Sequence, residues 1–194
     1  MRIKRNMKFT RREINDLLIS WAVLSFALAV LWWGIDRPLL ILRMMPQSII
    51  AVGTGFAFHE MAHKYTAQRY GLAAEFRRWD FGLLMAVISS FLGFLFAAPG
   101  AVHIFGYADE KTMAKTSIAG PIVNFIVAIT SLGLSLILVD IDNFLFFLAY
   151  FNLFLALFNL LPIPPLDGSK VLKYNPILWG AVFFPILAVL IFAF

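Results

Sequence analysis

The chain has 194 residues, of which 61% are hydrophobic and only 14% are charged, and its mean hydropathy is +0.85. A soluble domain of this size is usually about half apolar, so the composition excludes an ordinary soluble domain and indicates an integral membrane protein. Cysteine is absent, which excludes disulfides and thiolate metal sites. The length indicates one domain, and no linker, repeat or low-complexity tract interrupts it.

The net charge of +5 comes mainly from the first twelve residues, MRIKRNMKFTRR, which hold six Lys and Arg. A basic segment directly before an apolar run is typical of a cytoplasmic anchor on an anionic leaflet, so the charge does not indicate nucleic-acid binding. The following run, Leu17–Ile35, is too long for the core of a signal peptide. We therefore predict a basic cytoplasmic arm over 1–16 and a single transmembrane domain over 17–194, with its core at 48–168.

Several apolar stretches approach the 20 or so residues that a membrane-spanning helix needs. They are Leu17–Ile35, Ser48–Tyr65, Ser117–Val139, Phe144–Leu161 and Pro176–Phe194. Another stretch, 81–107, contains Ser89-Ser90 and the turn signal Pro99-Gly100, and its second half is as compatible with strands around a turn as with a helix. The predicted fold is an all-α polytopic membrane protein of five to six transmembrane helices. We expect a re-entrant or β-hairpin insertion between the second and third spans.

The distribution of basic residues distinguishes the two span counts. If 81–107 does not cross the membrane, fourteen Lys and Arg lie on the inside and only Arg37 and Arg43 lie outside. If 81–98 crosses, the counts become ten and six. The positive-inside rule therefore favours five spans with a cytoplasmic N-terminus. Irregular backbone at membrane depth is tolerated only where protein or a wet cavity covers it.

The segment GFAFHEMAHKYTAQRYG, residues 55–71, carries ionisable groups at the end of the second predicted span. His59 and His63 are four residues apart, so on a helix they share one face and can reach one metal ion. Glu60 lies on the adjacent flank, where a HExxH glutamate acts as a base towards metal-bound water. Simple interfacial residues are the alternative, but an intramembrane carboxylate costs roughly 2.5 to 3.5 kcal/mol and indicates function.

A catalytic zinc site needs a third protein ligand, and without cysteine the candidates are His103 and the acidic residues. Asp167 stands out, since it follows three prolines in FNLLPIPPLDGSK, residues 158–170, that end the fourth predicted span. The alternative is that Asp167 only caps the next helix. With five spans, Asp167 and the histidine pair both lie at cytoplasmic helix ends. With six spans they would lie on the order of 20 Å apart.

Three motifs together resemble the site-2 protease family of intramembrane zinc metalloproteases, in a compact form without a visible PDZ or CBS domain. They are HEMAH (59–63), AGPIVN (119–124) and NLLPIPPLDG (159–168). The resemblance implies one Zn²⁺ per chain bound by His59, His63 and Asp167, with Glu60 as catalytic base. It also implies that Asn159 positions the substrate carbonyl or oxyanion.

The function predicted in this way is hydrolysis of a peptide bond within or near a transmembrane helix of a substrate protein. The bilayer and that substrate are the expected partners, and the active site is expected near the cytoplasmic side of the cell membrane. A metal-ion transporter and an inactive zinc-binding scaffold are the alternatives. Asn124 suits helix packing as well as catalysis, and His103 suits an interfacial position as well as the site.

Overall fold

The computed structural model describes residues 7–34 and 36–194, which are mostly helical. Its helices and strands, in chain order, are α1 (Arg11–Trp33), α2 (Pro38–Val52), α3 (Phe58–Arg69), β1 (Ala73–Arg78), α4 (Asp80–Phe91), β2 (Gly100–Phe105), α5 (Glu110–Ser135), α6 (Asp142–Asn159), α7 (Asp167–Tyr174) and α8 (Pro176–Ala193). A π-helical turn over Gly53–Ala57 joins α2 to α3, and a short 3-10 turn over Val139–Ile141 precedes α6.

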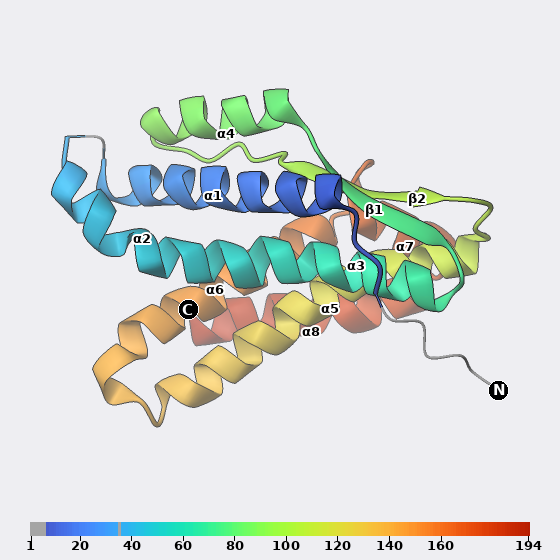
Figure 1. Cartoon of the computed structure of the whole chain (residues 1–194). Helices are drawn as coiled ribbons and strands as arrows, with labels where there is room; N and C mark the ends of the chain where they lie inside the picture. The colour runs from blue at the N-terminus through green and yellow to red at the C-terminus, as the bar shows by residue number, and fades with distance from the viewer. Residues whose placement is uncertain (1–6, 35) are drawn as a thin grey trace.

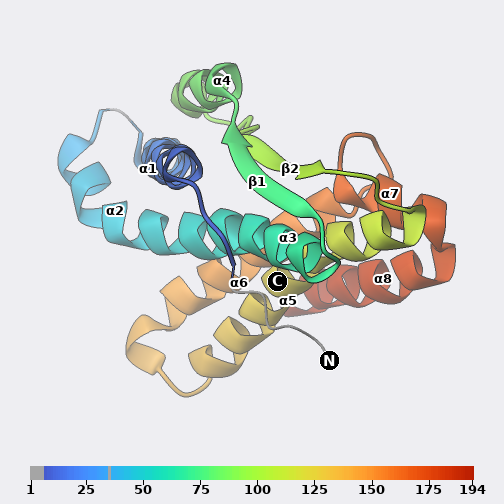
Figure 2. The ribbon, with the colours of Figure 1, turned by 45° about the vertical axis from the view of Figure 1, so that its right-hand side comes forward.

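The long helices run back and forth between two ends of the molecule (Figure 1). The β1–β2 pair and α7 lie at the end where α3 finishes, and α4 lies beside α1 on the side away from α2 and α3 (Figure 2). Among the described residues, four helical segments are long and apolar enough to cross a membrane, namely Arg11–Trp32, Pro38–Arg69, Glu110–Ser135 and Pro176–Ala193. Two apolar helices are shorter, Asp80–Phe91 and Asn143–Asn159.

Two helices begin earlier than the spans that we predicted for them. The second predicted span was expected to start at Ser48, but α2 starts at Pro38. The third predicted span was expected to start at Ser117, but α5 starts at Glu110. Proline is favoured in the first turn because that turn needs no N–H donor, and Asp109 caps α5 by accepting a hydrogen bond from Thr112 N at 2.9 Å. Hydropathy locates the apolar part of a helix, whereas these local signals set its start.

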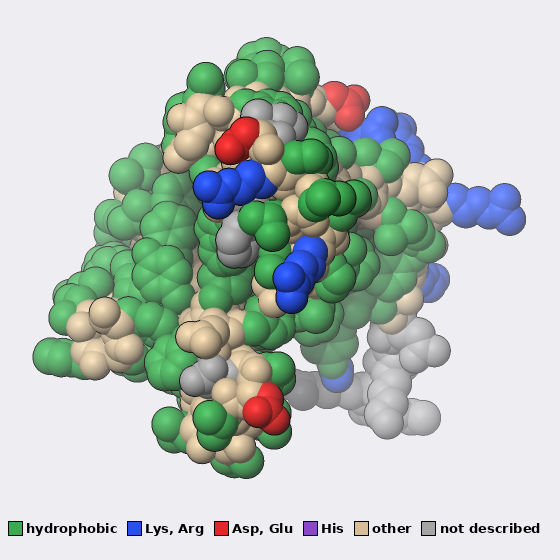
Figure 3. All heavy atoms as spheres, turned by 90° about the vertical axis from the view of Figure 1, so that its left-hand side faces the viewer, with side chains coloured by type: hydrophobic (Ala, Val, Ile, Leu, Met, Phe, Trp, Pro, Cys, Tyr) green, Lys and Arg blue, Asp and Glu red, His purple; other side chains and the backbone are tan. Residues whose placement is uncertain are grey.

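Two hydrophobic clusters hold the helices together. The first joins α1, the end of α2 and the π turn to the sheet, α4 and α6, around Leu28, Phe56 and Phe76. The second joins α5 and α6 to α8, around Leu153 and Ile186. Hydrophobic side chains also dominate the surface at the end away from the sheet, where few charged groups interrupt them (Figure 3). A surface of this kind suits a lipid environment.

The sheet is a pair of antiparallel strands, β1 and β2, with Ala73 opposite Phe105 and Arg78 opposite Gly100. The insertion predicted at 81–107 therefore leaves out one strand of the pair, because β1 lies upstream of α4, in a stretch where no strand was predicted. Pro99-Gly100 is not a turn between two strands but the start of β2. In AAEFRR, Ala74 and Phe76 are buried and alternate with more exposed residues, as expected for a strand. The two arginines at 77 and 78 end this alternation, so the strand is hard to recognise in the sequence.

A buried ion pair attaches the sheet to α1 and α3. Lys64 Nζ lies 2.6 Å from Glu13 Oε1 and 3.0 Å from the carbonyl oxygen of Ala74, and both charged side chains are fully buried. Glu13 Oε1 also accepts a hydrogen bond from Phe76 N at 3.0 Å. Nearby, the hydrogen bond that the Thr10 hydroxyl donates holds the pKa of Glu75 below its ordinary value. The start of α1 is thereby fixed to the edge of β1.

We expect Lys64→Met to lower the free energy of unfolding by about 3–5 kcal/mol, because it leaves the Glu13 carboxylate buried without a counter-ion. Chemical denaturation in detergent, followed by circular dichroism, measures the loss. Adding Glu13→Leu to the variant should recover part of the stability, although Phe76 N–H would still lack its partner.

Lys173→Met is the matched control. Lys173 pairs with Glu110 at 2.7 Å on an exposed surface, where an ion pair contributes little. Equal destabilisation by the two substitutions would show that the buried pair has no special role.

Candidate metal centre

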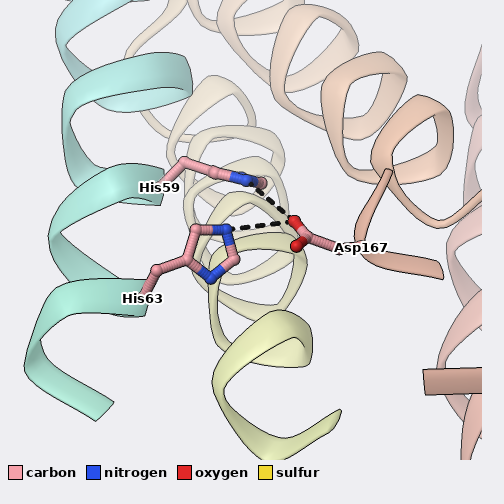
Figure 4. A group of neighbouring side chains, drawn as sticks. All are labelled: His59, His63 and Asp167. Carbon is pink, nitrogen blue, oxygen red and sulfur yellow. Dashed lines mark ion pairs between the residues drawn. The ribbon is translucent and has the colours of Figure 1, made fainter. Parts of the chain in front are cut away.

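Three side chains from two helices converge in the interior (Figure 4). Asp167 Oδ2 lies 3.3 Å from His59 Nε2 and 3.0 Å from His63 Nε2. One ligand atom from each residue lies within 4.8 Å of the others. All three side chains are largely buried. Of the residues that we considered as metal ligands, the structure brings together His59, His63 and Asp167.

Helix geometry and a tight turn produce this convergence. His59 and His63 are one turn apart on α3, so their rings project from the same face. α6 ends at Asn159, and the proline-containing segment then leads to Asp167, the first residue of α7. Gly168 is needed directly after it, because a Cβ there would lie 2.0 Å from the carbonyl oxygen of Leu160. The turn packs against its own helix end, and this contact brings Asp167 to α3.

Hydrogen bonds orient both imidazole rings. His63 Nδ1 lies 2.8 Å from the carbonyl oxygen of Thr116, which can only accept, so Nδ1 carries a proton and Nε2 is the ring nitrogen that faces Asp167. His59 Nδ1 lies 2.8 Å from Asn124 Oδ1 in the same arrangement. Metal-binding histidines in proteins typically donate their second ring N–H in this way. Both ring nitrogens that face the centre are therefore suited to bind a cation.

Gly120 of α5 forms the floor of the site. A Cβ at this position would lie 2.6 Å from Nε2 of His59 and 2.6 Å from Nε2 of His63. The absence of a side chain therefore keeps open the volume in front of the two nitrogen atoms. Two imidazole nitrogens and one carboxylate around such a volume form a ligand set that Zn²⁺ prefers, so these residues fit the ion.

We expect Gly120→Ala to weaken zinc binding by about 100-fold or more, the upper end of what disturbing the surroundings of metal ligands costs. The added methyl group must displace both imidazoles or occupy their shared volume. Competition with a chelator of known affinity measures the dissociation constant.

Gly133→Ala on the same helix is the control, because a Cβ at Gly133 meets nothing within 4 Å. It should bind zinc as the wild type does. Wild-type affinity in Gly120→Ala would contradict the ring positions described above.

Glu60 lies beside the three converging residues without joining them. It is 9% exposed, and its Oε2 accepts a hydrogen bond from Val102 N of β2 at 3.1 Å. The backbone of β2 thus contacts the helix that carries the HExxH motif. The outer edge of β2, on the side away from β1, faces Glu60.

The remaining predicted residues lie in different surroundings. Asn159, at the end of α6, donates its amide to the carbonyl oxygen of Leu155 at 2.9 Å. His103 lies exposed on β2 opposite Glu75, lining an open polar cleft with Arg12, and is not part of the group around Asp167. The sequence left open whether Asn124 serves helix packing or the site. In the structure Asn124 is fully buried between helices and also contacts His59.

Three features of the site were not predicted from the sequence. They are the floor at Gly120, the carbonyl group of Thr116 and the buried Asn152. Asn152 offered a signal, because it is a polar residue within the apolar run of the fourth predicted span. Thr116 acts through its main-chain carbonyl group and Gly120 through its lack of a side chain, and neither role can be recognised before the packing of α5 against α3 is known.

Comparison with known proteins gives consistent results. Residues 137–178 match the profile described as "Peptidase family M50". The chain is 39% identical over 191 residues to "Putative zinc metalloprotease MJ0611" of Methanocaldococcus jannaschii, covering 95% of this chain and 96% of that one. It is 29% identical to "Putative zinc metalloprotease YwhC" of Bacillus subtilis, covering 68% and 70%. A third relative, "Zinc metalloprotease MJ0392" of M. jannaschii, is 30% identical over 59% of this chain and 30% of its own length.

No solved structure matches the chain. The first relative is similar along nearly the whole of both sequences, and the matched profile includes the end of α6 and Asp167. On this similarity, the chain belongs to peptidase family M50, the site-2 protease family.

Proposed function

We propose that this chain is an intramembrane zinc metalloprotease that hydrolyses a peptide bond within or near a transmembrane helix of another membrane protein. One observation carries the proposal: His59, His63 and Asp167 converge beside Glu60 in a chain whose long helices are apolar enough to cross a membrane. The relatives named as zinc metalloproteases support the same chemistry.

His59, His63 and Asp167 would hold one Zn²⁺ per chain. When bound, this ion would polarise the scissile carbonyl and lower the pKa of a coordinated water to about 7. The fixed ring orientations of both histidines favour this role, because their lone pairs need no rearrangement before binding.

Glu60 is the proposed general base and acid. Its carboxylate would take a proton from the attacking water and deliver it to the leaving amine nitrogen. The hydrogen bond from Val102 N holds Oε2 of this carboxylate, which leaves Oε1 for the proton. The two oxygens of one carboxylate can therefore have separate tasks.

Asn159 is the proposed donor to the carbonyl oxygen of the substrate. An amide NH₂ has two hydrogens, so one can stay on the carbonyl oxygen of Leu155 while the other contacts the substrate. Such a donor stabilises the negative charge that develops on this oxygen during attack.

The substrate must reach this site as an extended peptide, because the amides of an intact helix are engaged in its own hydrogen bonds. The outer edge of β2 offers a place for such a segment. Its Val102 N–H points towards Glu60, so a strand added at this edge would run alongside the catalytic residues.

The same proposal includes a topology of five spans. Helix α6, the fourth span in chain order, would complete the five although its apolar part is short, because it runs antiparallel to α5 as the other long helices do to their neighbours (Figure 1). The twelve residues of α4 extend only about 18 Å, so α4 and the return to β2 would form a re-entrant insertion. The basic residues of β1, α7 and the start of α1 would face the cytoplasm, together with the active site.

Proteoliposomes that hold the purified chain and a library of tagged single-span peptides test the proposal. We expect zinc-dependent products whose new ends, located by mass spectrometry, fall within or beside the membrane-spanning segment. Zinc flux across the liposome without cleavage would support the transporter instead. Zinc binding with neither flux nor cleavage of any library member would support the inactive scaffold.

A further inference from the structure

A chain of buried amide groups extends from His59 to α6. Asn124 and Asn152 are both fully buried, on α5 and α6 respectively. Asn124 Nδ2 donates to the carbonyl oxygen of Gly55 at 2.9 Å and to Asn152 Oδ1 at 3.3 Å. Asn152 Nδ2 in turn donates to the carbonyl oxygen of Leu148 at 2.9 Å and to Thr54 Oγ1 at 3.2 Å.

The partners of these amides allow only one orientation for each. Main-chain carbonyl oxygens can only accept, so the NH₂ group of Asn152 must face Leu148 and its oxygen must face Asn124. For the same reason, the NH₂ group of Asn124 must face the carbonyl oxygen of Gly55. The oxygen of Asn124 is then left for His59 Nδ1, which must carry a proton to donate to it.

The π turn brings α6 close enough for this arrangement. Within Gly53–Ala57, a Cβ at Gly55 would lie 2.6 Å from Phe151 and 2.7 Å from Leu155 of α6. The glycine therefore lets α6 approach the helix that carries the histidines. Thr54 of the same turn donates to Ile50 O at 3.0 Å and accepts from Asn152. π turns inserted in α-helices are often associated with functional sites.

We infer that Asn152 is a positioning residue for the metal site, acting through Asn124 to keep the Nε2 lone pair of His59 directed at the metal. The amide oxygen of Asn152 accepts a hydrogen bond from the second N–H of Asn124 Nδ2. Without that acceptor, one N–H of Asn124 is buried without a partner, which is costly, so the amide group of Asn124 is expected to move. His59 Nδ1 then loses the acceptor that fixes the orientation of its ring. This inference rests on the zinc site of the proposed function.

Zinc affinity measured by chelator competition tests the inference without any substrate. We expect Asn152→Leu to weaken binding about tenfold and Asn124→Leu to weaken it by about 10–100-fold, the range for outer partners of metal ligands. The double variant should bind no more weakly than Asn124→Leu alone, because Asn152 acts through Asn124. Asn152→Asp, which keeps the acceptor oxygen, should bind zinc more tightly than Asn152→Leu.

Leu153→Ala is the control for a merely structural effect. Leu153 is also fully buried on α6 but has no part in the amide chain, so its loss should lower the unfolding temperature and leave zinc affinity unchanged. The absorption spectrum of the Co²⁺-substituted protein gives a second measurement, which should change in Asn152→Leu and not in Leu153→Ala. If Asn152→Leu does not fold, Thr54→Val removes the other end of the chain and should also weaken zinc binding.

Unchanged zinc affinity in Asn152→Leu, or losses that add in the double variant, would overturn the inference while leaving the zinc site intact. A loss of affinity in Leu153→Ala equal to that in Asn152→Leu would also overturn it. A wild-type protein that binds no zinc would instead overturn the proposed function.

Discussion

Glu60→Gln is expected to abolish cleavage while zinc stays bound. Glutamine keeps the size of the side chain and an oxygen that can accept from Val102 N, but it cannot take a proton from water. General-base catalysis contributes about 10²–10⁴-fold to a rate, so turnover should fall by at least this range. Product formation in proteoliposomes, together with zinc content per chain, measures both halves of the prediction.

The matched control is Glu110→Gln, which removes an acid from the exposed ion pair with Lys173 at the start of α5. It should cleave at the wild-type rate. Retained turnover in Glu60→Gln would remove Glu60 from the mechanism. Loss of zinc from this variant would mean that the carboxylate binds the metal, in place of its proposed role as base.

Asp167→Ala should lose zinc, and His103→Ala should keep it. Asp167 supplies the carboxylate that lies 3.0 Å from His63 Nε2 and 3.3 Å from His59 Nε2, whereas His103 lies exposed on β2. Two imidazoles alone hold zinc poorly because structural and catalytic sites use at least three protein ligands. We expect affinity to fall by well over the roughly 100-fold that the loss of an outer partner costs.

Equilibrium dialysis followed by elemental analysis measures this difference. Each variant is the control for the other, because Asp167 and His103 were both candidates for the third zinc ligand in the sequence. If His103→Ala loses zinc and Asp167→Ala keeps it, the ligand set and the folded positions of both residues are wrong.

The convergence of three site residues was predictable from the sequence for a physical reason. The spacing of His59 and His63 fixes their shared face on any helix. The excess of basic residues on one side favoured five spans, and this topology placed Asp167 at the same end as the histidine pair. The structure places one ligand atom from each of the three residues within 4.8 Å of the others.

Other features depend on contacts between distant segments, which residue patterns do not reveal. Strand β1 was not predicted, because Arg77 and Arg78 interrupt its alternation and only its pairing with β2 identifies it as a strand. The π turn at Gly53–Ala57 places Gly55 against Phe151 and Leu155 of α6, a contact between segments far apart in the sequence. The function of Asn152 becomes visible only once α5 and α6 lie side by side.

X-ray absorption at the zinc edge of the purified wild-type protein gives the most direct test of the proposed zinc ligands. We expect about one zinc per chain, with nitrogen and oxygen ligands at about 2.0–2.2 Å. We also expect the scattering of two imidazole rings, from His59 and His63. A third imidazole in the spectrum would place His103 at the metal and contradict the ligand set, and a purified protein that neither contains nor takes up zinc would contradict the proposed metalloprotease itself.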